Sequence, residues 1–598
     1  MELRFGMFRT IGAMLMLILP KKDHPKRWQS IILVATVGAL LLLEVGVNFG
    51  SNLWNRYFFD ALEKRAAQEV QWLALVFIGL IVVAGVTSMA AIWARLRLQI
   101  LWRELVTRRV TSRWISNNAF YRMTVMTGTA EYPEQRIAED VRLGVEPIVD
   151  LTSGLTTSLL NLIMFSGVLW VAGGSADFMG VTIPGAMFFA AVIYAFLVSS
   201  AMVLVGGKLA RRISSRSQAE ASYRYALTRV RENAESIALL HAGDAEKRIL
   251  SAEFDGVIDR WLAYARTWSA MTFVISANGL AHSIVPVLLM SPKYLSGDVT
   301  LGAVTQVAAA FGTVQAAAGW FTSNFAALSQ WYASATRVMQ LVDSIALADD
   351  QGSMHSRIQM QDSSDDKLRL EWVAVDLHSG QRLIAEANVE ISPGDATLVE
   401  GASGTGKSTL LRAMAGIWPW GSGAVQIPPD AKVMFLPQRP YLPHGRLAAA
   451  LAYPSTPDTF TTEEFAEVLV STGLQELVPL LEEGVSEAWD RKLSGGEQQR
   501  ISFARVLLHK PDIAFLDEAT SALDEPGQVR LMELFLTRLY GTTVVSVAHR
   551  PSLARYHAKR LYLRQDDTEV TIAERNASHD TTWHGMRAAL RQLRNTPA

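Results

Sequence analysis

The chain has 598 residues, half of them apolar, and its formal net charge is −1. This length exceeds that of one compact domain, so at least two domains are expected. The near-neutral charge argues against an extended nucleic-acid-binding surface. The sequence contains no cysteine, which excludes disulfides, thiolate metal ligands and cysteine nucleophiles.

The first apolar run covers residues 5–19 and is followed by Lys21 and Lys22. A secretory signal peptide is one interpretation, but the run has no small-x-small cleavage site and its heaviest charge follows it. We therefore expect an uncleaved interfacial helix, within an N-terminal cytoplasmic segment of residues 1–30.

Six further apolar runs are long enough to cross a bilayer, which takes about 20 residues each. They cover 31–50, 71–93, 154–173, 182–206, 268–290 and 301–325. Ala, Ser, Thr and Asn dilute the last two runs, as expected where helices pack closely. The sequence therefore predicts a six-helix, all-α membrane domain over residues 31–345, surrounded by membrane lipids.

Two connections between these runs are long, polar and free of turn clusters, which predicts helices that continue past the membrane. Both are rich in arginine, at 94–114 in the first and at 208–216 and 224–231 in the second, and the segment 21–27 is also basic. Because basic residues favour the cytoplasmic side, this pattern places the N-terminus, both long connections and the C-terminal half in the cytoplasm.

Polar residues inside the runs bear on what crosses the membrane. Glu44 lies deep in the first run, and Asn48 follows one turn later on the same face. A carboxylate in a membrane is costly, so these residues either line a substrate cavity or form a helix–helix hydrogen bond. Asn161 and His282 are expected to be packing contacts.

The composition changes after residue 345. Residues 346–367 are polar and predict a linker. From 368 to 598, strand and helix patterns alternate and no run is long enough to span a membrane, which predicts a soluble α/β domain.

The strand pattern at 396–400 leads into GASGTGKST and then into a helix pattern. This G-x-x-x-x-G-K-S sequence is typical of a phosphate-binding P-loop, whose backbone N–H groups hold phosphates at a helix N-terminus. Lys407 is expected to neutralise the β- and γ-phosphates, and Ser408 to bind Mg²⁺. The predicted ATP-binding residues are Gly401, Ala402, Ser403, Gly404, Thr405, Gly406, Lys407, Ser408 and Thr409.

A second acidic motif follows a hydrophobic strand pattern at 512–518, DIAFLDE. Paired acids after a strand usually form a solvated loop, but here they follow a P-loop. Asp517 is therefore expected to hold Mg²⁺, and Glu518 to orient and activate the attacking water.

The segment RKLSGGEQQR at 491–500 resembles the signature motif of ABC-transporter ATPases. The other motifs of that family follow in order, with Gln438 as the Q-loop glutamine, 521–524 as the D-loop and His549 as the switch histidine. The resemblance implies that Gln438 and His549 join Glu518 in catalysis and that Gln438 also binds magnesium. It adds ATP contacts at Ser494, Gly495, Gly496 and Glu497.

The resemblance implies a type 1 exporter-like membrane domain joined to a P-loop ATPase that uses ATP and Mg²⁺. A chain with one ATPase domain and six spans is expected to act as a homodimer. Each ATP would then lie between one subunit's P-loop and the other subunit's signature loop.

Adenine recognition departs from the family pattern. Many family members stack adenine on an aromatic residue upstream of the P-loop, but residues 373–380 contain no Tyr or Phe. His378 or Trp372 would have to serve as the stacking ring. Both are equally compatible with ordinary strand positions.

A narrower resemblance lies in the membrane half, at 52–62, 134–140 and 223–239. These segments are similar to the bacterial SbmA/BacA-like and YddA-like transporters and to peroxisomal acyl-CoA transporters. The subgroup usually has Leu where this chain has Gly495, which loosens the placement.

The expected function is ATP-driven transport of a bulky solute, a peptide or a cobalamin-like hydrophilic compound, across the bacterial inner membrane. Transport of fatty acyl-CoA or lipid, and regulation of a partner by a membrane-anchored ATPase, are the alternatives. Direction stays open, because the predicted layout is exporter-like whereas many SbmA/BacA-like proteins import.

Overall fold

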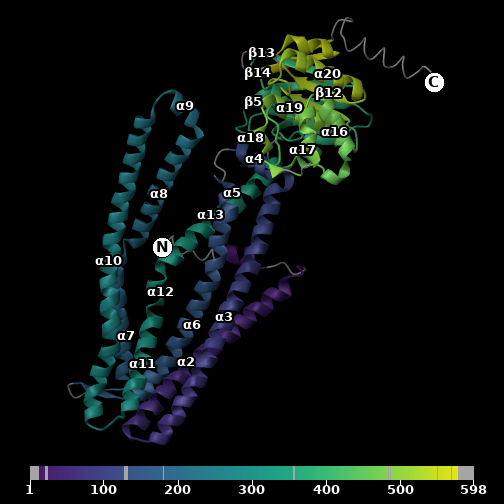
Figure 1. Cartoon of the computed structure of the whole chain (residues 1–598). Coiled ribbons are helices and arrows are strands. Elements are labelled where there is room, and N and C mark those ends of the chain that lie inside the picture. Colours follow the sequence, from purple (N-terminus) through teal and green to yellow (C-terminus); the bar gives the residue numbers. More distant parts are fainter. Residues whose placement is uncertain are drawn as a thin grey trace. The chain divides into compact units, whose positions relative to one another are not determined.

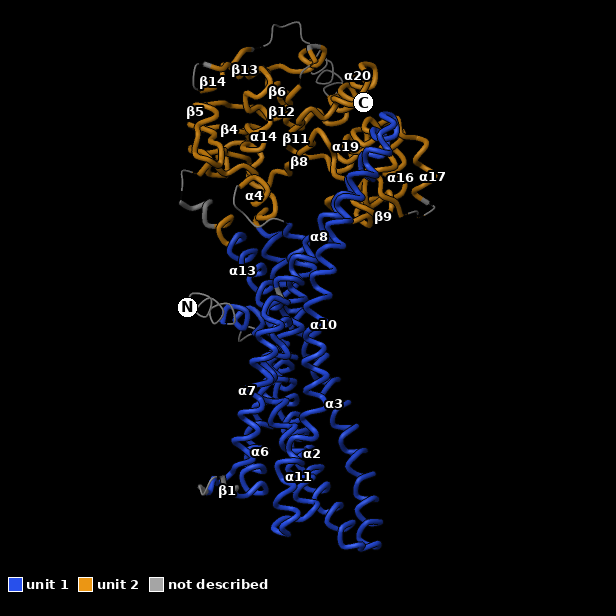
Figure 2. Tube along the Cα trace, turned by 90° about the vertical axis from the view of Figure 1, so that its left-hand side faces the viewer, with its two compact units in different colours: residues 1–116, 129–345 blue, residues 117–128, 346–598 orange. Residues whose placement is uncertain are grey.

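The computed structural model describes residues 12–19, 24–126, 132–178, 181–354, 357–482, 484, 486–548, 550–566 and 569–576. The chain forms two compact units, shown in different colours in Figure 2. The helical unit comprises residues 1–116 and 129–345, and the sheet unit comprises residues 117–128 and 346–598.

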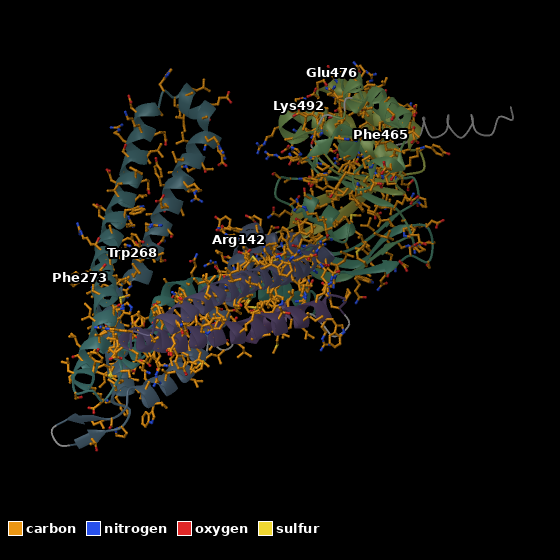
Figure 3. All side chains as sticks on the ribbon, turned by 60° about the horizontal axis from the view of Figure 1, so that its bottom comes forward. Arg142, Trp268, Phe273, Phe465, Glu476 and Lys492 are labelled. Carbon is orange, nitrogen blue, oxygen red and sulfur yellow. The ribbon has the colours of Figure 1, made fainter. Side chains whose placement is uncertain are left out.

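The helical unit contains the six predicted membrane-spanning helices, each long and apolar enough to cross a bilayer (Figure 1). They are α2 (Arg27–Glu63), α3 (Ala67–Ile115), α6 (Val141–Ala172), α7 (Ala186–Gly206), α10 (Gly243–Leu295) and α11 (Leu301–Ala318). Large apolar side chains point outward from them. Trp268 and Phe273 of α10, for example, are 47% and 75% exposed (Figure 3). Such surfaces suit contact with lipid, and the protein is an integral membrane protein.

Two predicted span boundaries were wrong. The fourth helix begins at Ala186, because Val181–Ile183 (β2) pairs antiparallel with Ala176–Phe178 (β1). The sixth helix ends at Ala318, where the N–H of Gly319 bonds back to the carbonyl of Gln315. The chain then continues through α12 (Trp320–Ser323) into α13 (Phe325–Met354).

The C-terminal end of α2 caps the N-terminus of α11. The backbone N–H of Leu301 donates to Glu63 Oε2 at 2.9 Å, and that of Gly302 donates to Asp60 Oδ1 at 3.0 Å. A side chain at Gly302 would not fit, because its Cβ would lie 2.1 Å from the carbonyl oxygen of Arg56. Carboxylates at a helix N-terminus satisfy free N–H groups and the helix dipole, so this contact fixes the two helices together.

The expected interfacial N-terminal helix is only partly described, at residues 12–18, and it packs into the helical unit. Met14 and Ile18 are fully buried, and Arg109 Nη1 donates to the carbonyl of Leu17 at 2.6 Å. Met16 of the same helix is 80% exposed, so an interfacial position stays a prediction for this part of the run. Residues 5–11 lie outside the described residues.

The long connections form helical extensions. The first contains α4 (Ala119–Val125), α5 (Pro133–Gln135) and η2 (Arg136–Asp140), and the second contains α8 (Leu209–Glu232) and α9 (Ala234–Leu239). Within the helical unit, Asp140 is buried and receives two hydrogen bonds from Arg337 of α13, at 2.6 and 2.8 Å. This ion pair joins the start of α6 to the extension of the last span.

The sheet unit is built on a ten-stranded mixed sheet in the order β3-β7-β4-β5-β14-β13-β6-β12-β11-β8. The strands are β3 (Gln359–Asp362), β4 (Leu368–Asp376), β5 (Arg382–Ile391), β6 (Ala396–Gly401), β7 (Gly421–Ile427), β8 (Val433–Leu436), β11 (Ile513–Asp517), β12 (Thr543–Val547), β13 (Lys559–Asp566) and β14 (Glu569–Asn576). The strands from β13 through β6, β12 and β11 to β8 pair in parallel. The central strands are fully buried and apolar, as expected when both faces of a parallel sheet are covered.

Helices and a short strand pair complete the sheet unit. They are α14 (Lys407–Met414), α15 (Leu447–Ala452), α16 (Thr462–Ser471), α17 (Pro479–Glu482), α18 (Trp489–Lys492), α19 (Gly495–His509), α20 (Glu525–Arg538), β9 (Gly445–Arg446) and β10 (Ser486–Glu487). Two cores hold them, one beneath α14 and one around α16 and α19.

The segment predicted as a linker, 346–367, is not one in the structure. Its start is the end of α13, and β3 pairs in parallel with β7 as the edge strand of the sheet. Ile358, which precedes β3, is 2% exposed, so burial of this side chain overrides the polar composition around it. Residues 117–128 also join the sheet unit, where Arg122 Nη2 bonds Asp349 Oδ1 at 2.7 Å.

Candidate functional site

The predicted P-loop forms a tight turn between β6 and α14. Gly404 and Gly406 have φ values of +84° and +85°, which side-chain-bearing residues rarely adopt. At Gly406 a Cβ would also lie 2.9 Å from Leu383 Cδ2. The turn brings the backbone N–H groups of the loop to the N-terminus of α14, an arrangement that binds phosphate.

Lys407 lies inside this loop and is 6% exposed. Its Nζ donates to the carbonyl oxygens of Gly401 and Ala402, at 3.0 and 2.8 Å. Burial lowers the pKa of Lys407, and the charges of Glu518 and Asp517 oppose that shift. The ammonium is thus held beside the loop with two acids near it. Thr405 stabilises the same turn by donating to the carbonyl of Ala402 at 2.9 Å.

The strand order brings the predicted metal-binding oxygens together. Ser408 Oγ donates to Asp517 Oδ1 at 2.7 Å, although the two residues are 109 positions apart. Asp517 ends β11 and is 6% exposed. A hydroxyl and a carboxylate beside a phosphate-binding loop are oxygen ligands that suit Mg²⁺ with a nucleotide.

Glu518 follows directly, in a backbone conformation that side-chain-bearing residues seldom adopt, with φ of +49°. This conformation costs on the order of 1 kcal/mol or more. The N–H of Glu518 is held by the carbonyl of Val547 at 3.1 Å. Gln438, after β8, donates from Nε2 to Glu518 Oε2 at 2.9 Å. The two predicted catalytic side chains therefore meet, because β8 pairs with β11.

The predicted signature residues begin α19. Ser494 is its N-cap, and the Ser494 hydroxyl donates to Glu497 Oε2 at 2.7 Å. The hydrogen bond from the hydroxyl of Ser494 lowers the pKa of Glu497 most, and the bond from the backbone N–H of Ser494 lowers it further. Gly495 and Gly496 form the first turn, where a Cβ at Gly496 would lie 3.3 Å from the carbonyl oxygen of Ala522. The signature turn thus packs closely against residues 521–524.

Comparisons with known proteins identify the family of this chain. Residues 16–295 match the family model described as ABC transporter transmembrane region 2, and residues 384–521 match the model described as ABC transporter. The chain is 30% identical to an uncharacterized ABC transporter ATP-binding protein of Synechocystis, over 94% of this chain and 84% of that one. The chain belongs to the ABC transporter family.

Two other relatives align over most of both chains. The inner membrane ABC transporter ATP-binding protein YddA of Escherichia coli is 29% identical, over 88% of this chain and 92% of that one. The human lysosomal cobalamin transporter ABCD4 is 26% identical, over 90% and 92%. The sheet unit is the ABC ATPase domain, and this transporter couples ATP hydrolysis in it to transport.

Gln499 is a site residue that the sequence analysis missed. This ABC signature-helix side chain is 2% exposed and joins two other loops. Its Nε2 donates to the carbonyl of Gln438 at 3.2 Å and to the hydroxyl of Ser521 at 3.1 Å, while its Oε1 accepts from the N–H of Ala522 at 2.9 Å. The amide therefore links the Q-loop, the D-loop and the signature helix. Its place inside LSGGEQQR is the only sequence signal for this role.

Arg550, next to the predicted switch histidine, makes a second link to the D-loop. Its Nη1 donates to the carbonyl of Leu523 at 2.8 Å, and its Nη2 to that of Ser521 at 3.3 Å. His549 itself lies outside the described residues, so its role stays a prediction.

The two candidates for adenine stacking lie on β4 and on the turn that follows it. Trp372 is 66% exposed and lines a cavity of about 450 Å³ with residues of β3, β4 and β7, and no P-loop residue lines that cavity. His378 lies on an exposed turn after β4. Adenine stacking on either residue stays a prediction.

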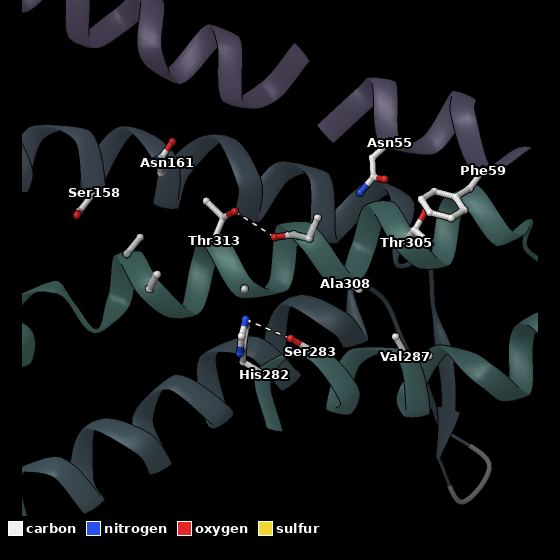
Figure 4. A pocket seen from close by; sticks show the side chains of 14 residues that line it. Asn55, Phe59, Ser158, Asn161, His282, Ser283, Val287, Thr305, Ala308 and Thr313 are labelled. Carbon is white, nitrogen blue, oxygen red and sulfur yellow. Dashed lines mark hydrogen bonds between the residues drawn. The ribbon is translucent and has the colours of Figure 1, made fainter. Parts of the chain in front are cut away.

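The predicted substrate residues also lie apart from the cavity in the helical unit. A cavity of about 810 Å³ lies among the spans, and neither Glu44 nor Asn48 lines it. Asn161 and His282, which were expected to be packing contacts, do line it (Figure 4). Glu44 and Asn48 therefore do not belong to this cavity, and their part in a substrate path stays a prediction. The energetic cost of placing Glu44 in a membrane does not indicate which faces of the helices line a cavity.

Proposed function

We propose that this ABC transporter works as a homodimer with alternating access and moves a bulky polar solute, a peptide or a cobalamin-like hydrophilic compound, across the bacterial inner membrane. The observation that carries the proposal is a cavity of about 810 Å³ with uncharged polar groups in its lining, bounded by four of the six spans of a chain with one ATPase domain. A regulatory ATPase would not need such a cavity.

Each side chain of the nucleotide site has a defined task in this proposal. The P-loop N–H groups and Lys407 bind and position the ATP phosphates. Ser408, Asp517 and Gln438 would hold Mg²⁺, which screens the phosphate charge. Glu518 accepts the proton of the attacking water, and its contact with Gln438 holds it in place.

Signature residues are available for the nucleotide of a second subunit. Ser494 and the N–H groups of Gly495 and Gly496 form the N-terminus of α19, which favours contact with a γ-phosphate. Because the same chain carries an intact P-loop and Glu518, both sites of a homodimer would be competent.

The arm formed by α8, α9 and α10 also favours a dimer. α8 packs along α10, and at the end of α9 the side chains of Leu239 and Leu240 are 73% and 77% exposed. Adjacent exposed leucines on the cytoplasmic side need cover, and a partner chain would provide it.

The proposed cargo and the proposed membrane are supported by two relatives as well as by the cavity. One relative is named a lysosomal cobalamin transporter, and another an inner membrane protein. A lining that offers amide, hydroxyl and imidazole groups, and no Asp, Glu, Lys or Arg among the described residues, suits amide-rich solutes better than the phosphates of an acyl-CoA.

The test is ATP-dependent flux in proteoliposomes of defined orientation, read in both directions for cobalamin, a short peptide and palmitoyl-CoA. We expect flux of cobalamin or the peptide with the native chain and none with Glu518→Gln. Movement of palmitoyl-CoA alone would show an acyl-CoA transporter. Undiminished hydrolysis without movement of any of the three would favour a regulatory ATPase.

A further inference from the structure

The cavity in the helical unit is bounded by four helices, α2, α6, α10 and α11 (Figure 4). Its volume of about 810 Å³ lies in the range that encloses a small organic molecule or part of a larger one. Every bounding helix contributes polar groups to the lining. These are Asn55 from α2, Ser158 and Asn161 from α6, His282 from α10, and Thr305 and Thr313 from α11.

Small residues of α11 create the space on one side. Ala308, Ala309 and Gly312 line the cavity. Gly312 lies against the imidazole of His282, so that a Cβ at this position would stand 3.3 Å from His282 Cδ2. A branched side chain at Gly312 would enter the cavity and displace the ring.

The hydrogen bonds of His282 define what its ring offers to a ligand. Nδ1 lies 2.9 Å from the carbonyl oxygen of Gly279, so Nδ1 carries the hydrogen and donates it. Nε2 is then an acceptor. Among the described residues, the hydroxyl of Ser283 approaches Nε2 only at 3.4 Å, which makes a weak bond. The ring therefore presents an acceptor with most of its capacity unused.

Asn161 lines the cavity but does not offer its amide oxygen to a ligand. Its Oδ1 is sealed from solvent and has no hydrogen-bond partner in the described part of the chain, so only the rest of the side chain contributes to the lining. The hydroxyl of Thr313 already donates to the carbonyl of Ala309 at 3.0 Å.

Among the residues that the structure describes, no Asp, Glu, Lys or Arg side chain lines the cavity. The acid adjacent to the lining residue Phe59, Asp60, accepts from the N–H of Gly302 and lies 3.9 Å from Arg56. It is thus already engaged. An ionised ligand group would lose its hydration here without finding a counter-charge, which is costly inside a membrane.

We propose that this cavity binds an uncharged, hydrogen-bonding part of the cargo, such as an amide, with Nε2 of His282 accepting a hydrogen bond from it. The inference deepens the proposed function and rests on it, because the ligand is the transported solute. It assigns His282 to cargo selection and excludes ionised groups from this subsite.

A binding measurement without transport tests the inference. The full-length protein in lipid nanodiscs is titrated with an uncharged capped peptide, acetyl-Gly-Gln-Asn-Gln-Gly-amide, and with its matched anion, acetyl-Gly-Glu-Asp-Glu-Gly-amide. We expect the uncharged peptide to bind at least tenfold more tightly than the anion. Gly312→Val and His282→Phe should each weaken its binding about tenfold, whereas His282→Gln, which keeps an acceptor, should weaken it less.

Asn48→Ala is the matched control, since Asn48 is a polar residue of α2 outside the lining. Thermal unfolding of all four variants near the native temperature shows that they fold. Native peptide binding by Gly312→Val and His282→Phe, equal binding of the anion, or no binding to the native chain would each overturn the inference. Selective peptide binding without any flux would support the subsite and overturn the proposed transport function. ATP-dependent flux together with native peptide binding by Gly312→Val and His282→Phe would support the transport function and overturn the subsite.

Discussion

The two units differ in how their polar side chains are used. In the sheet unit the site residues bond to one another across the fold, as Ser408 does with Asp517 and Gln438 with Glu518. In the helical unit the cavity residues bond mainly within their own helix, as His282 does with Gly279. The sheet unit is thus preorganised for one ligand, whereas the helical unit keeps hydrogen-bonding capacity for cargo.

The largest effect is expected from Glu518→Gln, which removes the proton acceptor while keeping the shape of the side chain. Phosphate release should fall at least about 100-fold, the usual contribution of a general base. Peptide binding in the helical unit should not change, which sharpens the contrast between the units. Glu533→Gln, at an exposed acid of α20, is the control. Near-native hydrolysis by Glu518→Gln would assign the base role elsewhere.

A pH effect confined to the sheet unit is expected from His557. This ring is fully buried, its Nδ1 bonds the carbonyl of Leu553 at 2.9 Å, and burial lowers its pKa to about 4. Because the folded-state pKa lies below the unfolded one, near 6.5, the unfolded chain binds the proton first. The free energy of unfolding is therefore highest above pH 6.5, and it falls by about 3 kcal/mol as the pH drops to 4.

His557→Asn should flatten this slope. Thermal unfolding of the full chain, followed through signals of the sheet unit between pH 7 and pH 4, measures the difference. Equal slopes for the native and variant chains would mean that other groups dominate the acid sensitivity.

The ion pair of Asp140 and Arg337 is expected to matter for the helical unit alone. Arg337→Ala leaves the buried Asp140 carboxylate without its two strong hydrogen bonds. We expect a loss of about 2 kcal/mol, less than for a fully buried pair because Arg337 is 44% exposed. Arg108→Ala, in an exposed pair with Glu104, should cost below about 0.5 kcal/mol. Thermal unfolding compares them, and equal losses would refute a special role for Asp140.

The smallest effect is expected from Gln499→Leu, which cuts the link between the Q-loop and the D-loop but removes no reacting group. ATP hydrolysis should fall about tenfold, equivalent to 1.4 kcal/mol, and stimulation by peptide should be lost. ATP affinity should change little, because Gln499 does not belong to the P-loop. Gln565→Ala, an exposed glutamine of β13, is the control. Undiminished stimulation by peptide would show that the link is dispensable.

The sequence allowed prediction of features that depend on local order. The P-loop needs only its own glycines, lysine and serine between a strand and a helix, and its structure is as predicted. The six spans were also recognisable, since each carries its apolar surface within one run. The order of the motifs shared with the ABC family identified Gln438 in the sequence. The pairing of β8 with β11 explains why its side chain contacts Glu518.

The sequence did not allow prediction of features that depend on which surfaces of distant helices and strands pack together. Glu44 was singled out for its cost in a membrane, yet the cavity arises where small residues of α11 face His282. Ile358 is buried because β3 adds to the sheet edge, although its surroundings have the composition of a linker. Gln499 resembles any polar helix residue until the fold places two loops against it.

The central claim is that hydrolysis in the sheet unit drives movement of cargo selected in the helical unit. The most direct test measures ATP hydrolysis and cargo flux together in the same proteoliposomes, for the native chain, Glu518→Gln and Gly312→Val. We expect Glu518→Gln to lose both activities, whereas Gly312→Val should lose flux but keep basal hydrolysis. Flux that persists in Glu518→Gln, or native flux in Gly312→Val, would contradict the claim.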